Sequence, residues 1–325
     1  MLIGLLEHDR GRLHESSFET LTAVRRLAAH SDMPFAALLI GAAAAPHLER
    51  FAAYGVSTVY QVEDERLTDY APESWAHAAS DVLATAQPQA VIAAGTERGN
   101  EVMAYLAARL ELPMAANCTE VRPGDPYEVT RMRWGGSLLE DAKLKGTPKL
   151  LTLAVHAVAA EQAPVPTLTV VRPVRPNLSD KDFRARVTGR VEATAGKVSL
   201  ADARVVVGGG RGVGSAEGFK DLEELAELLG GTVGVSRVVT SLGWRPHSDQ
   251  VGQTGTRIAP DLYIACGISG AIQHMVGCKS AKHILAINTD PDATMVSKAD
   301  YAVIGDLHQV LPAISAAIRK KRKAS

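Results

Sequence analysis

The chain has 325 residues, which is enough for about two domains of the usual size. Its 35 basic and 36 acidic residues give a net charge of −1, so the composition indicates no basic surface for nucleic acid. Hydrophobic residues make up 46% and charged residues 22%, which is typical of a folded globular protein and excludes a disordered chain.

The three cysteines, Cys118, Cys266 and Cys278, lie far apart and show no metal-ligand spacing, so no metal site is expected. We expect them to be reduced thiols that pack as small core residues in a cytoplasmic protein. The apolar runs are too short to span a membrane, and the N-terminus has neither signal-peptide nor transit-peptide features.

The first half alternates between short apolar runs and amphipathic stretches. Apolar runs predict strands at Leu2–Leu6, Phe35–Ile40, Val56–Val62 and Ala90–Ala94. The helical period predicts helices at Glu15–Ala29, Trp75–Ala86 and Glu97–Leu110, the last capped by Thr96. Strands and helices that alternate over short joints favour a parallel α/β sheet.

The pattern changes after Pro113. Tyr127–Trp134 and Leu150–Val158 are predicted strands joined by glycine turns, which we interpret as an antiparallel extension of the first domain. A polar, proline-spaced stretch follows. We therefore expect an N-terminal α/β domain over residues 1–190, a linker region over 160–197 and a C-terminal domain over 198–325.

The second half resumes the α/β alternation. Strands are predicted at Arg204–Val207, Leu262–Cys266, His283–Ile287 and Tyr301–Ile304. Helices are predicted from a Ser215 cap to Leu229, where Gly230-Gly231 would end it, and over Asp306–Ile318. The fold class is thus two parallel-sheet α/β domains, of which the second is Rossmann-like.

The second half contains four glycine-rich or polar loops, each at an expected strand end. They are Gly208–Gly214, Gly234–Arg237, Gln250–Gly255 and Gly267–His274. Glycines let backbone N–H groups approach a phosphate, and Arg211 could chelate one, but the spacing fits neither a dinucleotide fingerprint nor a P-loop. Each loop alone is compatible with an ordinary turn. Because the carboxyl ends of parallel strands meet at one edge, four such loops favour a large nucleotide-like ligand.

These strings resemble the FAD domain of the electron transfer flavoprotein alpha subunit. The similar strings are VVVGGGRGVG (205–214), VGVSR (233–237), QVGQTG (250–255), PDLYIACGISGAIQH (260–274), AINTDPDA (286–293) and ADYAVIGDL (299–307). The first half resembles the family more loosely, through its α/β pattern and RMRWGGSLLEDAK (131–143).

The resemblance implies one bound FAD. Its contacts would come from Arg211, Ser236, Arg237, Val251, Gly252, Gln253, Thr254, Ser269, Gly270, Ala271, Ile272, Gln273, His274, Asn288, Asp306 and Leu307. Thr254 would bond near flavin N5, and Arg237 and His274 would face the N1–C2=O side. A cation or strong donor there stabilises an anionic semiquinone and raises the potential. No residue is expected to act as nucleophile or general base, which describes a redox carrier rather than an enzyme.

The resemblance also implies partners. The chain would be the alpha subunit of a heterodimer whose beta subunit binds AMP and packs against the first domain. Electrons would come from acyl-CoA or related dehydrogenases, as in fatty acid beta-oxidation, and pass singly to a quinone oxidoreductase. The stretch Pro164–Thr194 would then serve as a hinge between the domains.

Two alternative functions stay open. A nicotinamide-dependent oxidoreductase would need the dinucleotide fingerprint that the sequence lacks. A non-redox adenine-nucleotide-binding protein could use the turn Gly95-Thr96 of the first domain.

Overall fold

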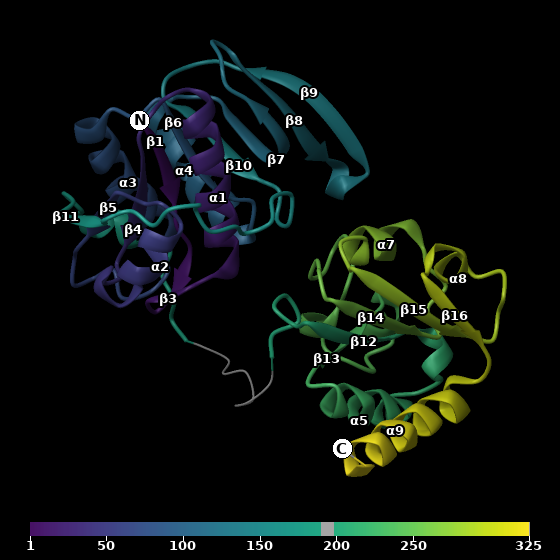
Figure 1. Ribbon diagram of the computed structural model, residues 1–325. Coiled ribbons are helices and arrows are strands. Elements are labelled where there is room, and N and C mark those ends of the chain that lie inside the picture. The colour runs from purple at the N-terminus through teal and green to yellow at the C-terminus, as the bar shows by residue number, and fades with distance from the viewer. Residues whose placement is uncertain (190–197, 325) are drawn as a thin grey trace. The chain divides into compact units, whose positions relative to one another are not determined.

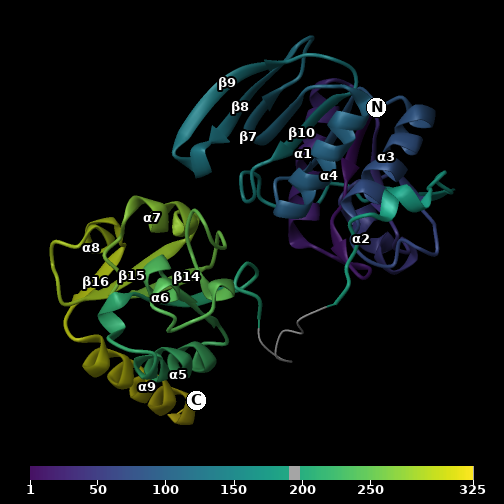
Figure 2. The ribbon, with the colours of Figure 1, turned by 180° about the vertical axis from the view of Figure 1, so that it is seen from behind.

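The computed structural model describes residues 1–189 and 198–324 and divides into two compact units, 1–191 and 192–325 (Figure 1). Residues 190–197 of the predicted linker lie outside the described residues. Each unit is an α/β sheet covered by helices, and the opposite view in Figure 2 shows the same two layers of helix around each sheet.

The N-terminal unit is built on a nine-stranded sheet with the order β11-β5-β4-β1-β6-β10-β7-β8-β9. The strands are β1 (Leu2–Leu5), β4 (Phe35–Ile40), β5 (Thr58–Val62), β6 (Ala90–Ala94), β7 (Met114–Arg122), β8 (Tyr127–Arg133), β9 (Leu138–Leu144), β10 (Lys149–Leu153) and β11 (Val170–Val174). All pairs from β11 to β7 are parallel, and β7, β8 and β9 pair antiparallel. A short separate hairpin joins β2 (His8–Asp9) to β3 (Arg12–Leu13).

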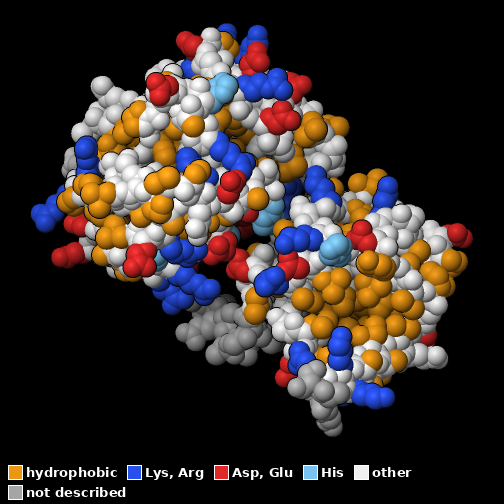
Figure 3. All heavy atoms as spheres, viewed as in Figure 1, with side chains coloured by type: hydrophobic (Ala, Val, Ile, Leu, Met, Phe, Trp, Pro, Cys, Tyr) orange, Lys and Arg blue, Asp and Glu red, His pale blue; other side chains and the backbone are white. Residues whose placement is uncertain are grey.

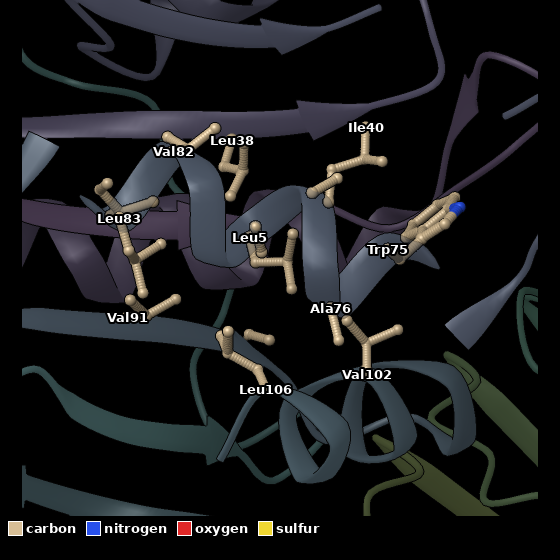
Figure 4. Packing of buried hydrophobic residues seen from close by; sticks show 14 of the residues in the cluster. Leu5, Leu38, Ile40, Trp75, Ala76, Val82, Leu83, Val91, Val102 and Leu106 are labelled. Carbon is tan, nitrogen blue, oxygen red and sulfur yellow. The ribbon is translucent and has the colours of Figure 1, made fainter. Parts of the chain in front are cut away.

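Helices cover both faces of this sheet. They are α1 (Glu15–His30), α2 (Leu48–Ala53), α3 (Pro72–Ala86) and α4 (Glu97–Leu110), with short 3-10 helices at Ala45–His47, Trp134–Gly136 and Asp180–Phe183. Figure 4 shows one core, where Leu5 and Val91 of the sheet meet Val82 of α3 and Leu106 of α4. Leu2 enters the core on the opposite face, so β1 is buried on both sides and needs a continuous apolar run.

The predicted start and end of α4 are confirmed. The Thr96 hydroxyl accepts a hydrogen bond from the Gly99 backbone N–H at 2.9 Å, as an N-cap residue does. The predicted strands Phe35–Ile40 and Ala90–Ala94 are also confirmed with their bounds.

Two predictions for the first half are wrong, and one strand is missing from them. Leu150–Val158 was expected in the antiparallel extension, but β10 lies between β6 and β7 and is parallel to both. The strand β7 was not predicted at all. Within the predicted linker, β11 pairs with β5 at the edge of the sheet. Its Pro173 is tolerated there because an edge strand has one side without ladder bonds.

The C-terminal unit is built on a five-stranded parallel sheet with the order β13-β12-β14-β15-β16. The strands are β12 (Val205–Gly209), β13 (Thr232–Val235), β14 (Leu262–Cys266), β15 (His283–Asn288) and β16 (Tyr301–Ile304). The helices are α5 (Lys220–Leu228), α6 (Arg237–Ser241), α7 (Ile272–Cys278), α8 (Thr294–Lys298) and α9 (Leu307–Ala324), with 3-10 helices at Arg211–Val213, Glu217–Phe219 and His247–Asp249.

The two faces of this sheet have separate cores. Val207 packs with Leu222 of α5 and Leu311 of α9, whereas its neighbour Val206 packs with Cys278 of α7 and Met295 of α8. Figure 1 shows α5 and α9 together on one face and α7 and α8 on the other. The prediction of two parallel-sheet α/β domains, the first with an antiparallel extension, is confirmed.

The predicted Ser215 cap is wrong, because two 3-10 helices follow β12 and α5 begins only at Lys220. The predicted end of that helix is confirmed. Gly230 has a positive φ of 65°, and the Gly231 N–H bonds back to the Ala226 carbonyl at 2.8 Å.

All three cysteines are free and buried, as predicted. Among the described residues, no helix combines the length and apolarity needed to cross a bilayer. In Figure 3, hydrophobic side chains gather on the face of the C-terminal unit that carries β16, where Tyr301 and Ile304 are exposed.

Candidate functional site

The site lies where the order of the C-terminal sheet reverses. From β12 the chain moves to β13 on one side, and β14 lies on the other side. The loops after β12 and β14 therefore leave in opposite directions and open a crevice at the carboxyl ends of these strands. Open α/β sheets bind ligands at such a switch point.

Glycines hold these two loops against each other. The Gly210 N–H donates to the Cys266 carbonyl at 2.9 Å, and the Gly212 N–H donates to the Gly267 carbonyl at 3.1 Å. A Cβ atom on Gly210 would lie 2.2 Å from the Gly267 oxygen, which no side chain tolerates. The glycines are therefore needed for the close packing of these two loops. A 3-10 helix, not an α-helix, follows β12 directly.

A cavity of about 630 Å³ occupies the crevice. Its walls come from all four loops that the sequence analysis singled out. Of the sixteen proposed contact residues, those that line it are Arg211, Ser236, Arg237, Val251, Gly252, Gln253, Thr254, Ser269, Ala271, Gln273, His274 and Asn288. Ligand cavities typically measure roughly 300–1,000 Å³.

Four of the sixteen residues lie outside the cavity lining. Gly270 is buried with a φ of 86°, and a Cβ there would meet the Met295 backbone nitrogen. Ile272 is exposed on the first turn of α7. Leu307 packs in the core under α9, and Asp306 accepts a hydrogen bond from the His308 N–H at 2.9 Å. Contact between FAD and these four residues stays a prediction.

Two buried polar atoms of the cavity wall have no hydrogen-bond partner among the described residues. They are the hydroxyl oxygen of Ser236 and Nδ1 of His274. A buried polar group without a partner costs about 1–3 kcal/mol. These atoms are therefore suited to a polar ligand that supplies the missing bonds.

The cavity wall also carries cations. Arg211 and Arg237 both line it, and neither forms an ion pair with a carboxylate in the described part of the chain. Asp290 is the one carboxylate in the lining, and it accepts a hydrogen bond from the Asp292 N–H at 2.9 Å. The charge of the site is thus suited to an anionic ligand.

His274 is a neutral group at this site. Burial lowers the pKa of its ring to about 4, and the Val251 backbone beside it acts more weakly in the opposite direction. Of the two groups expected on the N1–C2=O side of the flavin, Arg237 is therefore the cation and His274 is a neutral hydrogen-bonding group.

Gln250 opens one of the four loops that the sequence singles out, but it is not among the sixteen predicted contact residues. Its side chain is 2% exposed, lines the cavity and donates from Nε2 to the Thr254 hydroxyl oxygen at 2.9 Å. Its Oε1 lies 2.8 Å from the Thr240 hydroxyl. The signal was available, because Gln250 opens the string QVGQTG that carries Thr254.

Asn288 connects two parts of the cavity wall. Its Nδ2 donates to the Ile268 carbonyl at 3.0 Å, and its Oδ1 accepts from the Asp290 N–H at 3.1 Å. The end of β15 is thereby tied to the loop after β14.

The chain is similar to known proteins over both units. Residues 199–279 match the family model described as the electron transfer flavoprotein FAD-binding domain, and residues 3–175 match the electron transfer flavoprotein domain. The electron transfer flavoprotein subunit alpha of Thermoanaerobacterium thermosaccharolyticum is 32% identical over 97% of this chain and 96% of its own. That of Bacillus subtilis is 33% identical over 97% and 96%, respectively. Protein FixB of Bradyrhizobium diazoefficiens is 36% identical over 97% of this chain and 88% of its own.

Proposed function

The chain belongs to the electron transfer flavoprotein alpha-subunit family, whose members are FAD-containing electron carriers rather than enzymes, and we propose that the crevice between β12 and β14 holds the flavin. The observation that carries this proposal is the pair of buried polar atoms, Ser236 Oγ and His274 Nδ1, that lack partners in the cavity wall.

The proposed contact residues can be assigned to three parts of a bound FAD: its pyrophosphate, its adenosine and its flavin ring. Arg211 and the exposed Ser269 lie on the two loops at the switch point, where a pyrophosphate or ribityl chain would pass. Asn288 ends β15 and Asp306 follows β16, and both suit the adenosine end. Thr254, Arg237 and His274 lie on the other walls and suit the flavin ring, with Thr254 near N5.

Bound FAD supplies the redox chemistry, because its ring accepts and releases electrons one at a time. The chain's part is electrostatic and positional. The Arg237 guanidinium would supply a fixed positive charge beside the pyrimidine part of a bound flavin, and the neutral His274 ring would supply a hydrogen bond there. Such a cation and donor would stabilise negative charge on a bound flavin and so suit a carrier of single electrons.

A beta subunit is the proposed permanent partner, and it would carry the AMP. Relatives of this chain are named alpha subunits, which supports a heterodimer. The N-terminal unit has an apolar end on its β8–β9 hairpin, where Trp134, Leu138 and Leu139 are 79%, 55% and 69% exposed. A subunit interface would cover such side chains.

We further propose acyl-CoA or related dehydrogenases as electron donors and a quinone oxidoreductase as the acceptor. A hinge in the stretch 164–194 would let the flavin approach both. β11 ties residues 170–174 to the N-terminal sheet, so such a hinge would lie after this strand.

The alternative of a nucleotide site at Gly95-Thr96 is disfavoured by the contacts of that turn. The Thr96 hydroxyl donates to the Glu7 carboxylate while it caps α4. A Cβ on Gly95 would lie 2.5 Å from the Asn117 amide oxygen. The turn is thus packed against the chain itself.

The first experiment is to co-express the chain with its candidate beta subunit, purify the complex and record its visible spectrum during stepwise reduction. A yellow complex with an anionic one-electron-reduced intermediate is expected. A complex that stays colourless after FAD is added would overturn the proposed function.

A further inference from the structure

We propose that Tyr263 is a positioning residue that holds His274 in one tautomer, so that the imidazole presents an Nδ1–H donor to the cavity. The inference rests on the proposed function only in taking the flavin as the acceptor of that hydrogen bond. The tautomer itself is a property of this chain.

The contact between the two side chains is short and buried. The Tyr263 hydroxyl oxygen lies 2.7 Å from His274 Nε2, and the rings are stacked with centroids 6.1 Å apart. Tyr263 is 0% exposed and His274 is 6% exposed. Nε2 is therefore engaged inside the protein. Nδ1 has no partner of hydrogen-bond geometry among the described residues, although the Val251 backbone is close enough to raise the pKa of the ring slightly, so Nδ1 is the nitrogen left for a ligand.

The direction of this hydrogen bond follows from what each group can satisfy. A neutral imidazole has one N–H donor and one bare nitrogen that accepts. Among the described residues, Nε2 is the one hydrogen-bond partner of the Tyr263 hydroxyl. If Nε2–H donated, the phenolic proton would be buried without an acceptor. If the phenol donates to Nε2, both groups are satisfied and the ring proton resides on Nδ1.

The protonation states support this direction. Burial raises the pKa of Tyr263 well above its ordinary value, so the phenol keeps its proton. Burial also keeps the His274 ring neutral at pH 7. Around pH 7 the Tyr263 phenol is therefore a donor, and the His274 ring is a neutral acceptor at Nε2.

The backbone makes room for this contact at one glycine. A Cβ on Gly208 would lie 2.3 Å from the Tyr263 hydroxyl oxygen. Gly208, inside β12, thus leaves the space that the phenol of Tyr263 occupies. Tyr263 lies in β14 and His274 in the first turn of α7, so sheet and helix fix the pair.

The consequence concerns the flavin. An Nδ1–H donor can bond to a carbonyl oxygen of the oxidised ring and gains strength when reduction makes that oxygen negative. A bare Nδ1 lone pair at the same place would repel it. Tyr263 therefore decides whether His274 favours or opposes reduction, although it does not line the cavity.

The test is nitrogen NMR of the full complex with ¹⁵N-labelled histidine, in which long-range ¹H–¹⁵N couplings show which ring nitrogen carries the proton. The chain has 10 histidines, so the signal is assigned by its loss in His274→Asn. We expect the Nδ1–H tautomer in the unmodified protein. An Nε2–H tautomer there would overturn the proposal, even if no variant could be purified.

Tyr263→Phe removes only the hydroxyl. We expect a mixture of tautomers in this variant and a flavin midpoint potential shifted to more negative values, with FAD still bound. Tyr127→Phe is the matched control, because the Tyr127 hydroxyl is buried in the N-terminal unit without a partner. An unchanged tautomer and potential in Tyr263→Phe would contradict the proposal. Loss of colour from the unmodified complex would instead contradict the proposed function, and the tautomer would still be measurable.

Discussion

The buried Gln250 side chain is joined to the exposed Thr254 by a hydrogen bond of 2.9 Å that fixes the loop between them. The other end of the Gln250 amide lies beside Thr240, the fourth residue of α6. One side chain thus connects the helix after β13 to the loop that carries the residue proposed to face flavin N5. This relationship leads to the first prediction.

Gln250→Met keeps the volume of the side chain and removes both hydrogen bonds. We expect the free energy of unfolding to fall by about 0.5–1.5 kcal/mol for each lost hydrogen bond, because water can still reach Thr254 and Thr240 keeps its bond to the Arg237 carbonyl. FAD should also be retained less well on dilution. Chemical denaturation and flavin release measure the two effects. Gln309→Met on the exposed face of α9 is the control and should change neither. Unchanged flavin retention in Gln250→Met would show that Gln250 does not support FAD binding.

Ser236→Ala should act in opposite directions on the two states of the protein. Without FAD, the Ser236 hydroxyl is buried and unpartnered, so its removal should leave the stability unchanged or raise it. With FAD, the lost hydrogen bond should weaken binding by about 1–3 kcal/mol. Unfolding of the FAD-free protein and titration with FAD measure these effects. Ser241→Ala, at the exposed end of α6, is the control. If Ser236→Ala binds FAD with the same affinity as the unmodified chain, Ser236 forms no hydrogen bond to FAD.

Arg237→Ala should leave FAD bound and destabilise the one-electron-reduced flavin. A unit charge at about 4 Å contributes on the order of 1–4 kcal/mol between the dielectric of water and that of a protein surface. The spectrum during stepwise reduction should accordingly show less of the intermediate and a lower first potential. Arg319→Ala on α9, where Arg319 pairs with Glu224 at 2.9 Å, is the control. An unchanged potential in Arg237→Ala would contradict its proposed role.

The lowered pKa of His274 predicts that the stability of the FAD-free protein depends on pH. Its folded-state pKa of about 4 is below the ordinary value of 6.5, so the unfolded state binds more protons between these values. Stability should therefore fall as the pH decreases from about 6.5 towards 4, by an amount on the order of 3 kcal/mol. Denaturation at several pH values measures it, and His274→Asn should flatten the slope.

His308 provides a control of opposite sign for this experiment. A hydrogen bond to Asp221 raises the pKa of His308, and its Nδ1 lies 3.2 Å from that carboxylate. Its contribution is fully present below the unfolded pKa and is lost as the pH rises through the folded value. His308→Asn should therefore leave the loss of stability at acidic pH in place. The same loss in His274→Asn as in the unmodified chain would refute the assignment to His274.

The sequence by itself determined the elements that depend on local chemistry. α4 follows its predicted bounds because the Thr96 cap and the apolar period both lie within the segment. The strands β4 and β6 were predictable because a run buried on both faces is apolar throughout. The loops of the C-terminal unit that form the cavity could also be predicted, since they carry the glycine-rich and polar motif strings.

Only the tertiary structure decided which segments lie together. The pairing of β10 with β6 and β7 joins residues far apart in the chain, and no local pattern encodes a partner. Ser215 has the right chemistry for a cap, but the two 3-10 turns after β12 move the start of α5 beyond it. At the site, the neutrality of His274, the room that Gly208 gives to Tyr263 and the anchoring by Gln250 all depend on burial and on contacts across the sheet. Desolvation and close approach are properties of packed neighbours, and these neighbours are brought together only when the chain folds.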